Sequence, residues 1–209
     1  KVTPMTSPAL DLSTLPAVGR EDVLADLRSA LENASRGEGT TLVLSGEQGT
    51  GKTFLSQVLQ TEAERRGFKV AAGRAYRAEA GVPYSLFSDA FLPLLRSIPD
   101  ETLTVLSRGG FPELQYLFPA LAGRQATPLQ EVENSAEFRT RVLWTFTELL
   151  RELSARDPLL VVLEDFHWAD ASSLELIHFL ARQTAGHPIL LLLTVDELGT
   201  EDLRGSKEL

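Results

Sequence analysis

Short apolar runs alternate along the chain with stretches in which apolar residues recur three or four positions apart. The runs predict four strands, at residues 41–45, 68–72, 159–163 and 189–193. The helical spacing predicts helices at 21–31, from Phe54 to Gly67, at 138–153, and from a cap at Asp170 to near Gly186. The run at 159–163 is apolar throughout, which is typical of a buried parallel strand. The alternation therefore predicts an α/β fold with a doubly wound, mainly parallel sheet.

Two stretches of the chain lack this regularity. Residues 1–17 carry three prolines among Ser and Thr with no apolar period, so a linker is expected there. Residues 74–135 contain six prolines and are expected to form short helices inserted over one face of the sheet. Residues 18–209 are expected to form one domain, because 209 residues suffice for one α/β core and are few for two. The chain starts at Lys1 rather than Met, which favours a piece of a larger protein.

Charge and composition exclude several classes of function. The formal net charge is −9, so no basic surface able to hold a nucleic-acid backbone is expected. No stretch approaches the roughly 20 apolar residues that cross a bilayer, and no leader segment opens the chain, so a cytoplasmic protein is expected. The lack of cysteine rules out disulfides and thiolate metal sites, and three scattered histidines disfavour a histidine metal cluster.

The clearest chemical signal lies between the first predicted strand and the helix that follows it. Residues 46–53 read Gly-Glu-Gln-Gly-Thr-Gly-Lys-Thr and match the phosphate-loop (P-loop) pattern G-x-x-x-x-G-K-[ST] in full. Glycines let the backbone wrap a polyanion closely, and successive N–H groups point inward at the positive end of a helix. Lys52 is expected to reach the β- and γ-phosphates of ATP, and the Thr53 hydroxyl to bind Mg²⁺. The residues expected to bind nucleotide here are Gly46, Gln48, Gly49, Thr50, Gly51, Lys52 and Thr53.

Two acidic residues complete the predicted site. Glu164 and Asp165 directly follow the apolar strand at 159–163. Magnesium and an attacking water both need carboxylates, which are usually offered at the end of a buried strand beside the loop. We expect the two acids to divide the tasks of holding Mg²⁺ and polarising the water, and the sequence leaves open which does which. The plainer alternative for the two acids is that they are surface residues at the end of a strand. The plainer alternative for the loop is a glycine-rich turn with a solvated lysine.

Other residues near this segment are interpreted as structural. A lone histidine on a loop, such as His167, is more typical of a structural hydrogen bond than of catalysis. Asp170 is expected to cap the helix that follows it. Trp144 and the phenylalanines of the helix at 138–153 are expected in the core rather than as base-stacking platforms.

Four motifs follow one another along the chain. They are Val18-Gly19-Arg20-Glu21, the phosphate loop, Gly73-Arg74, and residues 161–170, which read Val-Val-Leu-Glu-Asp-Phe-His-Trp-Ala-Asp. In this order they resemble the STAND-type, AAA+-related ATPase domains of large bacterial regulators, including LuxR-type ATP-binding and SARP-type transcriptional activators. The last motif is the most specific, because many NTPases share the phosphate loop. The resemblance implies a P-loop NTPase fold that binds ATP or ADP with Mg²⁺, with Val18, Gly19 and Arg20 against the adenine.

Two features depart from the family pattern. The last strand of such domains often ends in Thr-Tyr-Arg, whose arginine senses the γ-phosphate, whereas residues 194–196 are Thr-Val-Asp here. Asp196 in place of that cation favours slow or absent hydrolysis. The chain also stops at Leu209, before the further strand and helical lid that such domains usually carry. An ATPase core without its lid, which binds nucleotide less tightly, is therefore expected.

Three functions are compatible with these residues. The leading hypothesis is an ATP- and Mg²⁺-dependent switch that changes how the domain packs on a lid, helical repeats, an output domain of the same polypeptide, or further copies of itself. A kinase-like phosphotransferase would need basic residues that converge on the γ-phosphate, and the middle of the chain offers only scattered ones such as Arg74 and Arg77. A degenerate NTPase fold used for protein interaction is disfavoured by Lys52 and Asp165 and favoured by Asp196.

Overall fold

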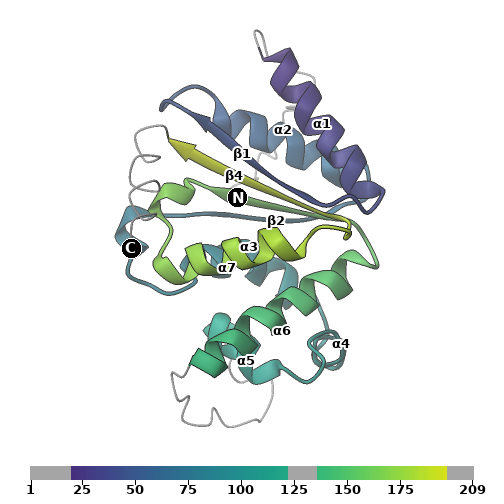
Figure 1. The fold of residues 1–209 in the computed structure, drawn as a ribbon, viewed down its shortest axis with the longest axis vertical. Coiled ribbons are helices and arrows are strands. Elements are labelled where there is room, and N and C mark those ends of the chain that lie inside the picture. The colour runs from purple at the N-terminus through teal and green to yellow at the C-terminus, as the bar shows by residue number, and fades with distance from the viewer. Residues whose placement is uncertain (1–19, 122–135, 197–209) are drawn as a thin grey trace, which may run out of the picture.

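A parallel four-stranded sheet forms the centre of the structure, a computed structural model that describes residues 20–121 and 136–196 (Figure 1). The strands are β1 (Thr40–Gly46), β2 (Lys69–Arg74), β3 (Leu159–Glu164) and β4 (Ile189–Asp196). They lie in the order β1-β4-β3-β2, and every neighbouring pair is parallel. The carboxyl ends of all four strands therefore meet at one edge of the sheet, where ligands bind in open α/β folds.

The register of the strands decides which residues meet at that edge. Gly46 at the end of β1 pairs with Asp196 at the end of β4. Arg74 at the end of β2 pairs with Glu164 at the end of β3. Two pairs of strand ends are thus brought together from segments far apart in the sequence.

Helices cover both faces of the sheet (Figure 1). One face packs against α1 (Glu21–Ser35) and α2 (Lys52–Arg65), and the other packs against α3 (Ser85–Arg96), α6 (Ala136–Ser154) and α7 (Ala171–Gln183). Alternate side chains of β3 enter the two cores, Leu160 and Val162 one of them and Val161 the other, which explains why this strand is apolar throughout. The shorter elements are η2 (Arg77–Glu79), α4 (Asp100–Leu106), α5 (Phe111–Leu117), η3 (Pro119–Leu121) and η4 (Phe166–Trp168).

Two close contacts fix the elements beside the carboxyl edge. A Cβ atom on Gly73 would lie 2.6 Å from the backbone nitrogen of Ala90, so glycine is what allows β2 to pack directly on α3. The buried Asp170 carboxylate caps α7 by accepting from the Ser173 N–H over 3.0 Å, and it also accepts from the Tyr84 N–H over 3.2 Å. The predicted cap is confirmed, and it additionally ties the start of α3 to the start of α7.

The predicted α/β fold with a parallel sheet is confirmed. β4 is longer than expected because it continues to Asp196, and α2 begins at Lys52 rather than at Phe54 because Gly51 already serves as its cap. The short helices over one face are also confirmed. Within residues 20–121 and 136–196, every helix falls short of the length or the apolarity that a bilayer crossing requires.

One expectation about the core is wrong. Phe138 and Phe146 of α6 are buried, but Trp144 keeps 42% of its surface exposed because it lies on the outward side of the helix. Its ring packs edge to face on Phe179, with 5.0 Å between the centroids. The linker expected at residues 1–17, and the chain after Asp196, lie outside the described residues.

Candidate functional site

The loop between β1 and α2 is built around two glycines in the left-handed region. Gly49 and Gly51 have φ angles of +82° and +86°, which cost residues with a Cβ atom roughly 1–2 kcal/mol. The turn is closed by Thr50, whose N–H and hydroxyl both donate to the Glu47 carbonyl, over 3.3 and 2.7 Å. α2 starts directly after it at Lys52, so the unpaired N–H groups at the positive end of that helix face the loop.

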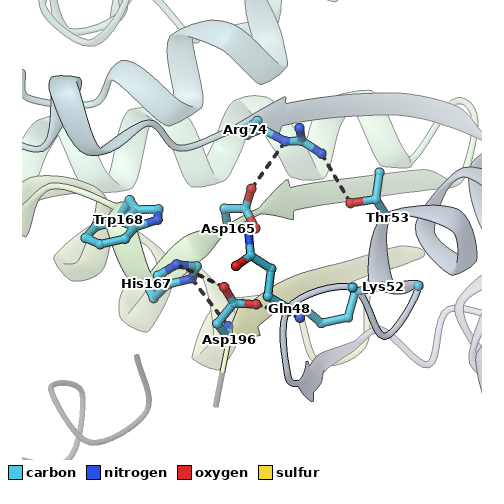
Figure 2. A pocket seen from close by; sticks show the side chains of 10 residues that line it. Gln48, Lys52, Thr53, Arg74, Asp165, His167, Trp168 and Asp196 are labelled. Atoms are coloured by element: carbon cyan, nitrogen blue, oxygen red, sulfur yellow. Dashed lines mark hydrogen bonds and ion pairs between the residues drawn. The ribbon is translucent and has the colours of Figure 1, made fainter. Parts of the chain in front are cut away.

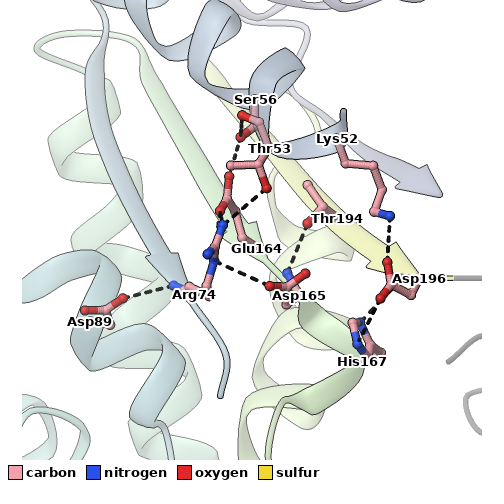
Figure 3. Close-up of polar contacts among 10 residues, drawn as sticks. All are labelled: Lys52, Thr53, Ser56, Arg74, Asp89, Glu164, Asp165, His167, Thr194 and Asp196. Carbon is pink, nitrogen blue, oxygen red and sulfur yellow. Dashed lines mark hydrogen bonds and ion pairs between the residues drawn. The ribbon is translucent and has the colours of Figure 1, made fainter. Parts of the chain in front are cut away.

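Lys52 lies in the wall of this loop with only 7% of its surface exposed. Its ammonium group donates to the carbonyls of Gly46 and Glu47, over 2.7 and 2.9 Å. It also forms an ion pair with Asp196, whose Oδ1 lies 2.6 Å from Nζ (Figure 3). An ammonium group has three donors, so a phosphate can bind Lys52 only by replacing one of these partners.

Asp196 is held in place from a second side by His167. The backbone N–H of Asp196 donates to His167 Nδ1 over 3.4 Å, and Asp196 Oδ2 lies 3.7 Å from His167 Nε2. Only 6% of the His167 side chain is exposed. These contacts fit the structural role expected of this histidine, and they orient the carboxylate toward Lys52.

Glu164 and Asp165 differ in their surroundings although they are neighbours. Glu164, with 9% of its surface exposed, accepts hydrogen bonds from the Ser56 hydroxyl of α2 and from the guanidinium of Arg74. Asp165 leaves the strand with a φ of +53°, and its N–H donates to the Thr194 hydroxyl over 3.0 Å. This left-handed conformation, uncommon in a residue with a side chain, ends β3 and turns the Asp165 carboxylate toward the open side of the sheet edge.

Arg74 connects these acids to the phosphate loop (Figure 3). Its guanidinium contacts Glu164, lies 3.4 Å from Asp165 Oδ2, and donates to the Thr53 hydroxyl over 3.2 Å. The hydrogen bond to Glu164 raises the pKa of Arg74 most strongly, with further contributions from the charges of Glu164 and Asp165. Arg74 is therefore cationic at any pH the folded protein tolerates.

These side chains line a pocket of about 350 Å³ at the carboxyl edge (Figure 2). That volume lies within the range of small-ligand sites. The pocket-lining residues are Gln48, Gly49, Gly51, Lys52, Thr53, Arg74, Asp165, His167, Trp168 and Asp196. The structure thus brings Asp165 and most of the predicted loop residues together in this lining, whereas Gly46 and Thr50 are not part of it. Glu164 lies behind the lining and contacts it through Arg74. Arg20 stands at the start of α1 and does not line this pocket, and Val18 and Gly19 lie outside the described residues.

The oxygen atoms around Arg74 are of the kind that bind a magnesium ion. A hydroxyl oxygen from Thr53 and carboxylate oxygens from Glu164 and Asp165 all lie around one guanidinium, and Mg²⁺ prefers such hard oxygen ligands. In the part of the chain that the structure describes, no group of three or more His, Cys, Asp or Glu side chains could hold a metal by itself. Mg²⁺ usually takes several of its ligands from water and from the phosphates of a nucleotide.

Sequence reasoning missed three partners of the site. Ser56 gives no signal, since a serine within a helix is usually unremarkable. Arg74 belongs to a recognisable motif, but its contact with Glu164 follows from the pairing of β2 with β3. Asp196 was noted as a departure, but its ion pair with Lys52 depends on the register of β1 and β4.

Comparisons with known proteins cover most of the chain. Residues 16–193 match the family described as AAA ATPase domain. An uncharacterized protein of Rhizobium meliloti (strain 1021) is 24% identical over 195 residues, which are 86% of this chain and 18% of that protein. The crystal structure of a DNA replication initiation factor is similar at 15% identity with a TM-score of 0.40, over 93% of this chain and 43% of that one. The chain thus spans less than half the length of either protein.

Proposed function

The chain belongs to the AAA ATPase domain family, a family of nucleotide-binding NTPase domains, and from this premise we propose that it is an ATP- and Mg²⁺-dependent regulatory switch with slow or absent hydrolysis. The switch would operate within a larger signalling or transcriptional regulator. The small share of the Rhizobium meliloti protein that the chain spans supports such a context. Its partners would be other domains of the same polypeptide and, in the assembled protein, further copies of itself that associate in a nucleotide-dependent way.

The ion pair between Lys52 and Asp196 carries this proposal. A phosphate on Lys52 must displace the Asp196 carboxylate, which is 2.6 Å away at the end of β4. One state has Asp196 on Lys52 and the other has nucleotide there, and ATP binds only the second. A ligand with such differential affinity shifts the population between the two states. Nucleotide binding would therefore break the side-chain contact between the end of β4 and the phosphate loop, and the resulting change at the end of β4 is the proposed output of the domain.

The same residues support slow hydrolysis. The two lysine and arginine side chains that line the described pocket, Lys52 and Arg74, both already contact acids. Efficient NTPases place an arginine on the transferring phosphate, worth roughly 10³–10⁵ in rate, and Arg74 would have to leave Glu164 and Asp165 before it could act in this way. An acid, Asp196, stands beside Lys52 instead, and it would repel the charge that develops on the phosphate.

Each residue of the site takes a role in this proposal. The loop N–H groups and Lys52 would bind the phosphates, and the Thr53 hydroxyl with Glu164 and Asp165 would hold Mg²⁺ and its water shell. When bound, Mg²⁺ would neutralise charge on the β- and γ-phosphates. Asp165, which lines the pocket, would polarise the attacking water, whereas the buried Glu164 faces Ser56 and Arg74. The adenine would lie against Val18, Gly19 and Arg20, as the family resemblance implies.

The same ion pair also favours one competing function. If Asp196 never leaves Lys52, the fold is a degenerate NTPase that serves protein interaction only. Thermal unfolding with and without ATP and Mg²⁺ distinguishes the two functions, because ATP at 100 times its Kd adds about 2.7 kcal/mol of stability to a domain that binds it. Phosphate release over hours then measures hydrolysis, and phosphate on an added acceptor would indicate a kinase.

Two lysine variants make this experiment specific. Lys52→Ala should abolish the stabilisation by ATP, while Lys69→Ala, an exposed lysine at the start of β2, should retain it. Stabilisation of the parent protein with little phosphate release supports the switch. Stabilisation of Lys52→Ala equal to that of the parent would refute the assignment of the lysine, and no response in the parent would leave the degenerate fold as the better description.

A further inference from the structure

A single guanidinium contacts oxygen atoms of three residues at the carboxyl edge of the sheet (Figure 3). Arg74 Nη2 donates to the hydroxyl of Thr53, the second residue of α2, over 3.2 Å. Arg74 Nε donates to Oε2 of Glu164 over 3.1 Å and lies 3.4 Å from Oδ2 of Asp165. The strand pairing of β2 with β3 fixes this arrangement, because Arg74 and Glu164 are register partners.

These oxygens are the ones that a magnesium ion would use in this pocket. Mg²⁺ binds carboxylate and hydroxyl oxygens at roughly 2.0–2.1 Å and completes its shell with water and phosphate. A guanidinium that shares the same oxygen atoms cannot remain there, because the two cations repel each other and compete for the same lone pairs. Arg74 and Mg²⁺ are therefore alternative occupants of one cation position.

We propose that Arg74 occupies the cation position of the site until Mg²⁺ enters with the nucleotide, and that its guanidinium then turns to the terminal phosphate of ATP. This inference rests on the proposed nucleotide function and names the residue that distinguishes ATP from ADP. Arg74 is then a specificity-determining residue. It supplies the cation at the terminal phosphate that Asp196, an acid, does not supply.

The contacts of Arg74 allow such a turn without movement of β2. Its backbone is fixed, because its N–H donates to Asp89 Oδ2 over 2.9 Å and the preceding Gly73 packs directly on α3. Its side chain is 38% exposed and lines the same pocket as Lys52. A fixed backbone with a long, partly exposed side chain lets the guanidinium change partners by rotamer changes alone.

Charge compensation favours the terminal phosphate as the new partner. Once Mg²⁺ neutralises Glu164 and Asp165, Arg74 loses the two acids that now hold it. The γ-phosphate is the group that distinguishes ATP from ADP, and arginine pairs with phosphate through two parallel hydrogen bonds. Arg74 is the one arginine among the residues that line the described pocket.

The first half of the proposal is tested with the metal alone. Thermal unfolding is measured for the parent, Arg74→Gln and Arg77→Gln with millimolar Mg²⁺ or with NaCl of equal ionic strength, and without nucleotide. Arg77 is the matched control, because its guanidinium stacks over the Trp168 ring at 5.2 Å instead of contacting the acids. Mg²⁺ should raise the unfolding temperature of Arg74→Gln clearly more than that of the parent or the control. An equal response in all three proteins would overturn the shared cation position.

The second half is tested by the preference for ATP over ADP, measured as the ratio of the two dissociation constants in Mg²⁺. Loss of a charge-assisted contact to the γ-phosphate should lower this ratio about tenfold or more in Arg74→Gln, mainly through weaker ATP binding. Arg77→Gln should keep the ratio of the parent. An unchanged ratio in Arg74→Gln, with ATP still bound, would refute the role of Arg74 at the terminal phosphate.

These two measurements separate a failure of the inference from a failure of the proposed function. If the parent binds neither nucleotide, the proposed function is wrong, and so is the role of Arg74 at the terminal phosphate. The measurement with Mg²⁺ alone still tests whether Arg74 and Mg²⁺ share one cation position. If Arg74→Gln does not fold, Arg74→Lys replaces it, because lysine keeps the charge but lacks the planar fork that reaches Thr53 and Glu164 together. The lysine variant should then show the same two changes, and parental behaviour in both would overturn the proposal.

Discussion

Lys52 and Asp196 are 144 positions apart in the sequence, yet their side chains form a 2.6 Å ion pair at the carboxyl edge of the sheet. The pairing of β1 with β4 creates this contact, since Gly46 at the entrance of the loop is the register partner of Asp196. The Asp196 carboxylate accepts one of the hydrogen bonds of the Lys52 ammonium group, and the phosphate-loop pattern assigns this same group to the nucleotide phosphates. Asp196 is thus the anion that pairs with Lys52, and Arg74 is the cation that pairs with Glu164.

The variant Asp196→Asn should bind ATP about tenfold more tightly than the parent. It removes a negative charge beside the phosphates and weakens the partner that competes for Lys52, and about 1.4 kcal/mol corresponds to a tenfold change. Isothermal titration calorimetry at fixed ionic strength measures the affinity. The control is Asp157→Asn, an exposed aspartate just before β3, which should bind as the parent does. Affinity that stays equal or falls in Asp196→Asn would contradict a competing carboxylate.

The variant Thr53→Ala should lose the part of ATP affinity that depends on Mg²⁺ and keep the part that does not. The Thr53 hydroxyl faces Arg74 over 3.2 Å in the cation position, whereas the loop N–H groups and Lys52 are unchanged by this substitution. ATP affinity is compared in Mg²⁺ and in EDTA. Thr61→Ala on the same helix is the control, because its hydroxyl donates to the Gln57 carbonyl of its own helix and not to the cation position. An equal loss in both solutions would mean that Thr53 acts on the loop rather than on the metal.

The sequence predicted the sheet and the loop because both depend on local patterns. A strand buried on both faces must be apolar throughout, as residues 159–163 are, and a phosphate loop needs glycines at the left-handed positions of Gly49 and Gly51. The different surroundings of Glu164 and Asp165 could not be predicted. They arise from a left-handed backbone at Asp165 and from the order of the strands. Neither feature can be inferred from the identity of neighbouring residues in the sequence.

Gly73→Ala should destabilise the protein by roughly 1–3 kcal/mol, the usual cost of overpacking. A Cβ atom there would meet the backbone of Ala90 at 2.6 Å and the Leu86 carbonyl at 2.8 Å, so β2 and α3 would have to separate. Because Arg74 follows directly, its contacts should weaken as well. Urea unfolding measures the change, with Gly81→Ala as control, since a Cβ on Gly81 would meet nothing within 4 Å. Equal stability of the two variants would show that this packing contact is unimportant.

The two neighbouring acids should respond differently to loss of charge. Asp165→Asn should keep the stability of the parent but release less phosphate, because its carboxylate lines the pocket. Glu164→Gln should lower the free energy of unfolding by about 1–3 kcal/mol, because Glu164 is buried and accepts from both Ser56 and Arg74. Urea unfolding, ATP affinity and phosphate release are measured on both variants. If Glu164→Gln is as stable as the parent while Asp165→Asn unfolds readily, the proposed roles of the two acids are wrong, and Asp165 is the residue that supports the edge of the sheet.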